Sequence, residues 1–479
     1  MTGPVITPRS TDISRWYLDI ITNAKLADYG PVKGTMVIRP YAYSMWERMS
    51  QILDGIFKET GVENAYFPLL IPESYLKKEA EHVEGFSPEL AVVTIAGGKE
   101  LEEPAIIRPT SETIINAFFA KWIMSYRDLP VLINQWCNVV RWEMRTRPFL
   151  RTSEFLWQEG HTAHENQEEA EAKTLEMLEI YRKFAEETLA IPVMVGRKTE
   201  TQKFAGAVAT YAIESLMQDN RALQAGTSHF LGQNFAKAFE ICFQDRQGNQ
   251  AHVWQTSWGV STRLIGALIL THGDDKGLRL PPLIAPIQVV IIPIYKKNDQ
   301  KEKDEVLKAA QRLANSFADD VRVKVDDSEQ DTPGFKFNEW ELKGVPLRIE
   351  IGPRDLKQNA CVVARRDTGE KTTVKLEAIG KTVDALLEDV QSSLLKQAQQ
   401  RIASNTHDLD DYKKFKDLLE EKGGLIYAHW CGDKACEGTI QDETKGTIRV
   451  IPFDQKKEVG KCIRCQKPSQ GRVIFAKAY

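Results

Sequence analysis

The side chains best suited to chemistry gather in one stretch of the chain, residues 141–164. An Arg141-x-Glu143 pair lies on one β-prone run, and Arg151-x-x-x-Phe155 opens another after a short basic turn. This pattern predicts two antiparallel strands joined by a basic loop. Guanidinium groups grip phosphate oxygens, a carboxylate accepts from the amino group of adenine, and a phenyl ring offers a flat face for a purine. The stretch therefore indicates a nucleoside triphosphate site; the alternative is an ordinary hairpin with surface arginines.

A further arginine, Arg263, stands where a glycine-punctuated strand runs into an apolar helix. From that junction its side chain can reach a triphosphate across the floor of a sheet. The alternative is an arginine at a helix start that pairs with a carboxylate. Triphosphate chemistry also requires Mg²⁺, which takes oxygen ligands. Our candidate ligand is Glu240 in the expected strand 239–241, with a solvent-facing strand residue as the alternative.

Two more segments carry side chains suited to a second ligand. Thr110 and Glu112 lie two apart on a loop before an amphipathic helix, where the alternative is a helix cap with an acid in the first turn. Trp157, Glu159 and His161 alternate along the second strand, and the period of two places all three on one face. An aromatic wall with a carboxylate suits a small, cationic and largely apolar ligand.

Four of the seven cysteines form two short hooks, Cys431-x₄-Cys436 and Cys462-x₂-Cys465. Four thiolates are a ligand set that tetrahedral Zn²⁺ prefers, and a closed four-sulfur site is structural rather than catalytic. The alternative is four reduced thiols without a metal. An odd, clustered count with no secretory signal favours a reducing, cytoplasmic location over disulfides.

The chain length of 479 residues allows two to four domains, and the net charge of −4 argues against a surface that is basic overall. No apolar run is long enough to span a membrane. The mixture of helices and strands predicts a multidomain α/β protein. Its parts are expected at 1–285, 286–382, 383–404 (a helical connector) and 405–479.

Apolar periodicity predicts the principal elements. The first part is expected to hold helices at 41–59 and 165–189, a strand at 65–67, and a glycine- and hydroxyl-rich turn at 224–232 where backbone approaches a ligand closely. In the second part strands alternate with helices, which indicates a mixed sheet. Its elements are expected at 287–292, 296–317, 321–325, 335–342, 347–351, 360–365 and 372–376.

The predicted hairpin resembles motif 2 of the class II aminoacyl-tRNA synthetases, and the junction at Arg263 resembles motif 3. The helix and strand within 41–67 resemble motif 1, which builds the dimer interface in that family. The resemblance implies a catalytic domain on an antiparallel sheet, ATP with Mg²⁺, and a homodimer. It also implies that Arg141 binds the α-phosphate, Glu143 the adenine edge and Arg151 the outer phosphates. Phe155 would stack on the adenine ring, and Arg263 would bind the γ-phosphate.

Five segments together resemble the archaeal and eukaryote-like branch of the prolyl-tRNA synthetases: RPTSET, FLRTSEFLWQEGHTAH, AGTSHFLGQNF, QTSWGVSTR and HGDDKGLRLPP. This resemblance implies that Gln224 and Thr227 face the adenosine. It implies that Thr110 and Glu112 receive the imino group of proline. The remaining proline-binding residues would then be Arg141, Trp157, Glu159, His161, Phe204, His229 and Ser261.

Residues 331–355 resemble the anticodon-binding domain of class IIa synthetases. Phe337, Glu341 and Arg348 are our candidates for reading the two guanines shared by proline anticodons, because single-stranded bases are read by stacking and by hydrogen bonds to their edges. The alternative for Phe337 is packing in the core. The last segment resembles the zinc-bearing C-terminal domain of this branch, in which the terminal carboxylate reaches back toward the catalytic domain.

The expected reaction is the ATP-dependent ligation of L-proline to tRNA(Pro) through prolyl-adenylate. Catalysis then rests on positioning and on neutralisation of phosphate charge, without an enzyme nucleophile. The interval from Phe155 to Ser257 is too short for the large editing domain of the bacterial-type branch, so no editing in cis is expected. The alternatives are a synthetase for threonine, glycine or histidine, a catalytically silent tRNA-binding paralogue, and a zinc-ribbon nucleic-acid protein.

Overall fold

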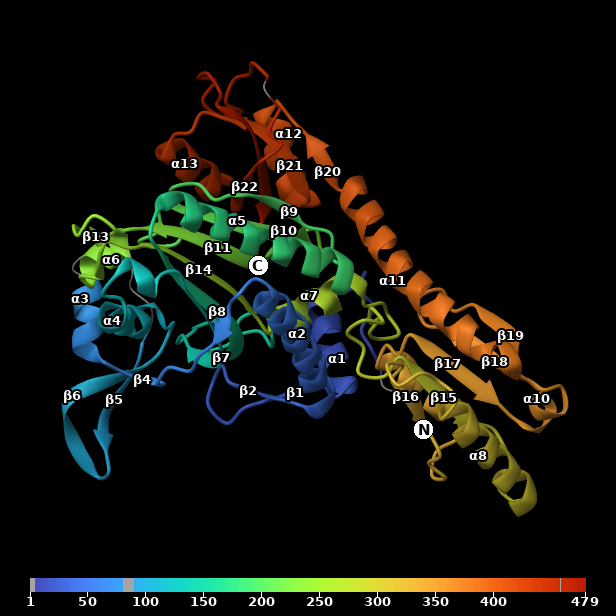
Figure 1. Ribbon diagram of the computed structural model, residues 1–479. Helices are drawn as coiled ribbons and strands as arrows, with labels where there is room; N and C mark the ends of the chain where they lie inside the picture. The colour runs from blue at the N-terminus through green and yellow to red at the C-terminus, as the bar shows by residue number, and fades with distance from the viewer. Residues whose placement is uncertain (1–4, 81–89, 457) are drawn as a thin grey trace.

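The computed structural model describes residues 5–80, 90–456 and 458–479, and it has three parts (Figure 1). The first part is built on a large sheet, the second on a separate five-stranded sheet, and the third on strands that extend the first sheet. The long helix α11 (Ile379–Ser404) runs from the second part to the third. The predicted multidomain α/β class is confirmed, and the helix expected at 383–404 begins four residues earlier, at Ile379.

Eleven strands form one continuous sheet among the described residues, in the order β20-β21-β23-β22-β9-β10-β11-β14-β8-β7-β3. Its pairs are antiparallel except β3 with β7 and β20 with β21. The strands of the first part are β3 (Glu63–Asn64), β7 (Val131–Val140), β8 (Glu154–His164), β9 (Met194–Arg197), β10 (Ala209–Leu216), β11 (Ala222–Gly232) and β14 (Trp254–Ser261). Those of the third part are β20 (Thr406–Asp408), β21 (Leu425–Trp430), β22 (Gly446–Pro452) and β23 (Gly471–Lys477).

Strands β7 and β8 form the predicted antiparallel hairpin, with Val140 opposite Glu154 at the end next to the connecting loop. Arg141 follows β7 and Arg151 precedes β8, so both lie in the basic loop rather than on strands. Phe155 lies on β8 opposite Val139. The arginines therefore come from the loop that joins the two strands, and Phe155 and Trp157 come from β8 itself.

Four helices share one core with the main sheet: α1 (Ile13–Asn23), α2 (Pro40–Glu59), α5 (Gln167–Lys183) and α7 (Arg263–His272). The helix predicted at 41–59 is thus confirmed, and the one at 165–189 continues beyond α5 as a π-helical turn, Phe184–Thr188. Trp258 packs so closely on Gly160 that a Cβ there would lie 2.1 Å from the indole. A glycine in β8 is therefore required by the packing below the sheet.

The predictions for segments 65–67 and 224–232 are wrong. The segment 65–67 is irregular because the N–H of Phe67 is bound to the side chain of Gln135 and Pro68 has no N–H to continue the pairing. The segment 224–232 is not a turn but the greater part of β11, in the middle of the sheet. Its small residues serve packing, since a Cβ on Gly226 would lie 2.9 Å from Val260.

Smaller elements surround the open face of the sheet. Helix α4 (Glu112–Trp122) packs in a second core with α6 (Asn234–Ala238). Helix α3 (Glu73–Ala80) lies beside them. The peripheral strands are β1 (Ala27–Tyr29), β2 (Met36–Ile38), β4 (Leu70–Pro72), β5 (Ala91–Ala96), β6 (Lys99–Ile107), β12 (Cys242–Gln244) and β13 (Gln250–His252).

The second part has the predicted mixed sheet, ordered β16-β15-β17-β18-β19. Strand β15 is buried along its whole length and pairs in parallel with β16 and β17. The strands are β15 (Val289–Pro293), β16 (Val323–Val325), β17 (Leu347–Ile351), β18 (Ala360–Arg365) and β19 (Lys371–Lys375). The helices are α8 (Gln300–Ala314), α9 (Pro333–Leu342) and α10 (Pro353–Lys357).

The third part carries helices α12 (Tyr412–Glu421) and α13 (Lys434–Thr444) beside its four strands. It joins the first part through β22 and β9, where Ile451 lies opposite Arg197 and Pro452 opposite Gly196. A Cβ on Gly196 would lie 2.3 Å from the carbonyl oxygen of Ile451, so this junction requires glycine. Across the described residues, no helix combines the length and apolarity needed to cross a membrane.

Candidate active site

One cavity of about 310 Å³ opens over β8, β11 and β14. It is lined by all the site residues predicted in the first part except Glu143, Arg151 and Glu240. The predicted residues that line it are Thr110, Glu112, Arg141, Phe155, Trp157, Glu159, His161, Phe204, Gln224, Thr227, His229, Ser261 and Arg263.

Arg141 packs against both aromatic rings of the hairpin, whose centres are 6.0 Å apart. Its guanidinium carbon is 5.6 Å from the ring centre of Phe155 and 5.4 Å from that of Trp157, and its Nε donates to the carbonyl of Pro109 at 2.9 Å. Burial lowers the pKa of Arg141, while Glu112 and other nearby carboxylates oppose that shift. The cation therefore joins the predicted nucleotide side of the cavity to the predicted amino-acid side.

Arg263 begins α7 at the end of β14, as the sequence predicts. Its Nε donates to the carbonyl of Leu150 at 3.2 Å and its Nη1 to that of Gln224 at 3.4 Å. Burial, and then the charge of Arg141, lower the pKa of Arg263. The guanidinium donates to carbonyls rather than to a carboxylate. A bound polyanion would therefore stabilise its positive charge.

Glu143 and Arg151 face each other in the loop outside the cavity. The Arg151 Nε and the Glu143 Oε2 are 3.2 Å apart, and both side chains are partly exposed. Both charges act on the pKa of Arg263. The pair therefore stands close to the arginine at the cavity floor, and a ligand that uses both residues has to replace their ion pair.

The loop before α4 is held in place by Arg108, whose side chain is buried. Its Nε donates to the carbonyl of Asn138 at 2.8 Å and its Nη1 to that of Phe67 at 2.6 Å. The same loop carries Thr110 and Glu112 into the cavity. A buried guanidinium with carbonyl partners thus fixes the loop on the hairpin.

Thr110 and Glu112 meet at the cavity wall. The hydroxyl of Thr110 donates to Oε2 of Glu112, and that of Ser257 donates to Oε1 at 3.2 Å. Ser111 occupies the N-cap position of α4 without a capping hydrogen bond. The side-chain cap in the alternative interpretation is therefore wrong, whereas the acid that it expects in the first turn is present as Glu112.

Glu159 and His161 form a buried pair on the predicted face of β8, with His161 Nε2 3.2 Å from Glu159 Oε2. Ser111 N–H donates to Oε2 at 3.0 Å, and Gln135 Nε2 donates to Oε1 at 2.9 Å. Burial opposes ionisation of Glu159, but the bonds from His161 and Ser111 prevail and lower its pKa. Burial likewise opposes protonation of His161, yet Glu159 and then Glu112 prevail and raise its pKa.

His229 differs from His161 although both line the same cavity. Its ring centre lies 4.7 Å from that of Phe204, and its Nδ1 is 3.0 Å from the hydroxyl of Thr210. Burial, aided by the charges of His161 and Arg141, lowers the pKa of His229 to about 3. The neutral ring of His229 and the ring of Phe204 form an uncharged wall beside the charged pair.

Eight lining residues were not predicted as site residues, and three of them carry amide or hydroxyl side chains: Gln202, Thr210 and Ser257. Across neighbouring strands Thr210 lies opposite His229, His229 opposite Ser257, and Ser257 opposite His161. The register between strands is the signal that reveals Thr210 and Ser257. Gln202 lies in an irregular loop that shows no period.

The proposal of Glu240 as a Mg²⁺ ligand does not fit the structure. The segment 239–241 is not a strand; Glu240 lies in an exposed turn after α6, with a positive φ of 56°. It does not line the cavity. The positive φ turns the chain between α6 and β12 at this residue, which the apolar neighbours of Glu240 did not indicate.

A second cavity, of about 280 Å³, contains all three candidates in the second part: Phe337, Glu341 and Arg348. The guanidinium carbon of Arg348 lies 4.2 Å from the ring centre of Phe337. Glu341 pairs at 3.0 Å with Lys276 of the first part. Trp340, by contrast, is buried in a small core. The cavity therefore offers an aromatic face, a cation and a carboxylate.

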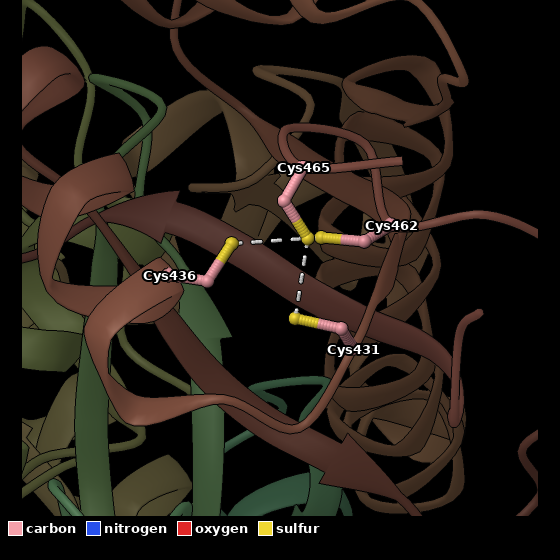
Figure 2. Close-up of side chains that lie close together, drawn as sticks. All are labelled: Cys431, Cys436, Cys462 and Cys465. Atoms are coloured by element: carbon pink, nitrogen blue, oxygen red, sulfur yellow. Dashed lines mark hydrogen bonds between the residues drawn. The ribbon is translucent and has the colours of Figure 1, made fainter. Parts of the chain in front are cut away.

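The four clustered cysteines converge, as Figure 2 shows. Their sulfur atoms all lie within 4.8 Å of one another, with Cys436–Cys462 and Cys431–Cys465 separations of 3.6 Å. A tetrahedral Zn²⁺ with Zn–S bonds of about 2.3 Å sets the sulfur atoms about 3.8 Å apart. The donor set and its spacing fit such a site.

Comparison with known families assigns each part of the chain. Residues 93–272 match the tRNA synthetase class II core domain (G, H, P, S and T), 288–386 match an anticodon binding domain, and 412–479 match the C-terminal domain of prolyl-tRNA synthetase. The fold and the cavity thus define a class II aminoacyl-tRNA synthetase.

Relatives narrow the class further. The chain is 55% identical to the proline–tRNA ligase of Natranaerobius thermophilus (99% of this chain, 98% of the relative) and 56% identical to that of Chlorobaculum tepidum (99% of each). A crystal structure of prolyl-tRNA synthetase from Cryptosporidium parvum, complexed with halofuginone and AMPPNP, matches with a TM-score of 0.94 and 42% identity over 99% of each chain. The chain belongs to the prolyl-tRNA synthetase family, and its reaction is the ATP-dependent ligation of proline to tRNA(Pro).

Proposed function

We propose that the 310 Å³ cavity makes prolyl-adenylate, with proline and ATP on opposite sides of Arg141. The carboxylate of proline attacks the α-phosphorus of ATP, the bond to pyrophosphate breaks, and pyrophosphate leaves. Arg141 binds the α-phosphate and Arg263 the γ-phosphate, so both neutralise charge that is redistributed during the attack. The remaining work is positioning, which needs no nucleophilic side chain.

Proline binds on the Glu112 side of Arg141. Its secondary ammonium group offers two N–H donors, and the oxygen of Thr110 with the carboxylate of Glu112 can accept both. Trp157, Phe204 and His229 surround the ring, with Glu159, His161 and Ser261 behind them. ATP binds on the other side, where Phe155 stacks on adenine and Glu143, Arg151, Gln224 and Thr227 complete the nucleotide site.

The supporting observation is that the guanidinium of Arg141 contacts both Phe155, assigned to the nucleotide, and Trp157, assigned to proline. A non-hydrolysable prolyl-adenylate analogue, in which a sulfamoyl group replaces the phosphate, tests it by titration calorimetry. Arg141→Lys is expected to weaken the analogue roughly 30-fold while weakening proline alone and adenosine alone much less. Equal weakening of all three ligands contradicts the proposed bridging position.

Mg²⁺ accompanies ATP in this reaction and would neutralise phosphate charge when bound. The described residues of this chain contribute the two cavity arginines to the same task. Glu240 is not proposed as its ligand, since it lies in an exposed turn outside the cavity.

The 280 Å³ cavity is proposed to read the anticodon. Phe337 would stack on a base, while Glu341 and Arg348 bond to base edges. The Lys276–Glu341 ion pair connects this cavity to the first part. Recognition of the anticodon is therefore assigned to residues that do not line the adenylate cavity.

The cysteine cluster is proposed to hold a structural Zn²⁺ through Cys431, Cys436, Cys462 and Cys465. Zn²⁺ would fix the turn before α13 and the 462–465 hook relative to each other. The four thiols line no part of the adenylate cavity. The metal is thus assigned to folding rather than to chemistry.

Several further properties are proposed from the resemblance. The chain is a cytoplasmic homodimer of the archaeal and eukaryote-like type, in which α2 and β3 stand where motif 1 builds the interface. Its domains are 1–285, 286–382, the connector 383–404 and 405–479. The interval between Phe155 and Ser257 is occupied by strands of the main sheet, α5, α6 and the β12–β13 pair, which supports the absence of editing in cis. Light scattering in solution tests the dimer.

A further inference from the structure

The loop 198–208 between β9 and β10 lies against the adenylate cavity. Gln202 and Phe204 from this loop line the cavity. At its two ends Lys198 N–H donates to the carbonyl of Thr210 at 2.8 Å, and Val208 N–H donates to that of Phe230 at 2.9 Å. Between these anchors the chain follows no strand, so the position of Phe204 depends on contacts made by individual side chains.

Thr199 organises the first half of this loop. Its carbonyl accepts from Gln202 N–H at 3.1 Å and from Lys203 N–H at 2.9 Å. Its hydroxyl lies 3.1 Å from that of Thr201 and donates to Oε1 of Glu437 at 2.8 Å. Glu437 belongs to the third part of the chain, 238 residues away. A side chain of another domain is therefore bonded directly to the residue that forms the turn.

Glu437 is buried and closely tied to the cysteine cluster. Glu437 is only 4% exposed, and Thr199 is 2% exposed. It follows Cys436 in the first turn of α13, so the fold of the cysteine hook sets its position. Its other oxygen, Oε2, is buried and has no hydrogen-bond partner within the described part of the chain. The hydrogen bond from Thr199 therefore offsets part of the free-energy cost of burying the Glu437 carboxylate.

The second half of the loop is bound to the first part, through Phe204 N–H to the hydroxyl of Thr210 at 2.9 Å and Asn234 Nδ2 to the carbonyl of Gly206 at 2.8 Å. The contacts of the third part lie at the other end, beside Thr199. Lys198 Nζ bonds to Glu214 at 2.6 Å and to the carbonyl of Arg449 at 2.8 Å, and β22 pairs with β9 at Arg197 and Gly196. These contacts place the end of β9 against the third part. The Thr199–Glu437 bond carries that attachment one step further, into the loop.

We propose that Glu437 is a positioning residue for proline binding, which acts by fixing Thr199 and, through the loop, Phe204. This inference rests on the proposed assignment of Phe204 to the proline side of the cavity. Loss of the bond loosens the loop around Thr199. Part of the binding free energy of proline is then used to order the loop, so the KM for proline rises. The ATP side, formed by the hairpin and α7, is unaffected.

The test uses the full-length, zinc-loaded enzyme and ATP–pyrophosphate exchange. Glu437→Ala and Thr199→Val remove the same bond from its two ends, and Thr199 lies in a different part of the chain from the cysteines. Each is expected to raise the KM for proline roughly tenfold, with kcat and the KM for ATP within about twofold of wild type. The double variant should be no worse than the single ones.

Two variants serve as references. Glu437→Gln keeps an oxygen that accepts from Thr199 and should restore a KM for proline close to wild type. Asp442→Ala removes an exposed carboxylate from the same helix and should change nothing. Zinc content, measured by mass spectrometry, is expected to equal that of wild type in Thr199→Val.

Hydrogen exchange of the 198–208 segment separates this inference from the proposed function. Faster exchange together with a raised KM for proline supports both. Faster exchange with a raised KM for ATP alone overturns the inference for proline and places Phe204 on the nucleotide side, against the proposed function. Unchanged exchange and unchanged KM values in Glu437→Ala and Thr199→Val overturn the positioning role and leave the adenylate assignment intact.

Discussion

The hydroxyl of Tyr479 donates a 2.6 Å hydrogen bond to Oδ2 of Asp219, in the turn between β10 and β11. Its ring centre lies 5.7 Å from the guanidinium carbon of Arg147, which is also 4.6 Å from the ring of Tyr17. Tyr17 donates to the carbonyl of Pro148 at 2.7 Å. The basic loop of the hairpin is thus held by one tyrosine from each end of the described chain.

We expect Tyr479→Ala to impair ATP binding, although Tyr479 does not line the adenylate cavity. Loss of the ring removes one support of Arg147, worth about 1 kcal/mol for a partly exposed cation–π contact, and loosens the loop that carries Arg151. The KM for ATP in pyrophosphate exchange should rise roughly fivefold. Tyr479→Phe keeps the ring and should show a smaller rise. Unchanged ATP kinetics in Tyr479→Ala contradicts this role of the C-terminus.

Arg263→Lys tests charge neutralisation at the cavity floor. Lysine keeps the charge but cannot keep the bonds to Leu150 and Gln224 while it reaches a phosphate. The rate of pyrophosphate exchange at saturating ATP should fall by roughly 100- to 1000-fold. Arg279→Lys, outside the cavity, is the matched control. A loss below about tenfold argues against a role in the transition state.

The His161–Glu159 pair predicts a dependence of stability on pH. Burial opposes protonation of His161, but Glu159 and Glu112 outweigh it and raise the pKa of His161 above its usual 6.5. Folding therefore favours the protonated ring. Its contribution is complete below about pH 6.5 and is lost as the pH rises through the raised pKa. His161→Gln should therefore lower the thermal midpoint most at pH 6, and the difference from wild type should shrink toward pH 9.

His407→Gln, on β20 and outside the cavity, provides the reference for this series. A difference between wild type and His161→Gln that stays constant or widens as the pH rises would show that the pair is not an ion pair.

Removal of one thiol tests the metal assignment. Cys436→Ser should lose the bound zinc, which is measured per chain by mass spectrometry, and should lower the thermal midpoint by roughly 5–10 °C because metal binding contributes to folding. Cys361 is a buried thiol in the second part. The Cys361→Ser variant should therefore contain as much zinc as wild type. Equal zinc content in Cys436→Ser and wild type contradicts the four-sulfur site.

Phe337→Ala separates tRNA recognition from adenylate formation. Loss of one base-stacking contact, about 1–3 kcal/mol, should lower kcat/KM for aminoacylation roughly 10- to 100-fold, while pyrophosphate exchange is unchanged. Phe335→Ala on the same helix removes an exposed ring that does not line the second cavity. If both variants aminoacylate equally well, Phe337 does not stack on the anticodon.

Local patterns were sufficient for much of the site. The period of two on β8 brought Trp157, Glu159 and His161 to one face, and the strand–helix junction placed Arg263. These features depend on a few neighbouring residues, which the sequence displays directly. Small residues misled the prediction at 224–232, because composition typical of a turn here serves close packing in a central strand.

Contacts between distant segments were beyond such patterns. Ser257 and Thr210 enter the cavity through strand register, and Gln135 bonds to both Ser111 and Glu159. The Thr199–Glu437 bond joins two domains. None of these has a local signal, since each depends on how separate parts of the chain pack.

Amino-acid-dependent ATP–pyrophosphate exchange, run with all twenty amino acids and without tRNA, tests the central claim most directly. It reports adenylate formation and the identity of the amino acid together. The structure predicts exchange driven mainly by proline, and its loss in Arg141→Ala. Exchange driven mainly by another amino acid, or none in a folded, zinc-loaded sample, would contradict the assignment of the cavity to prolyl-adenylate.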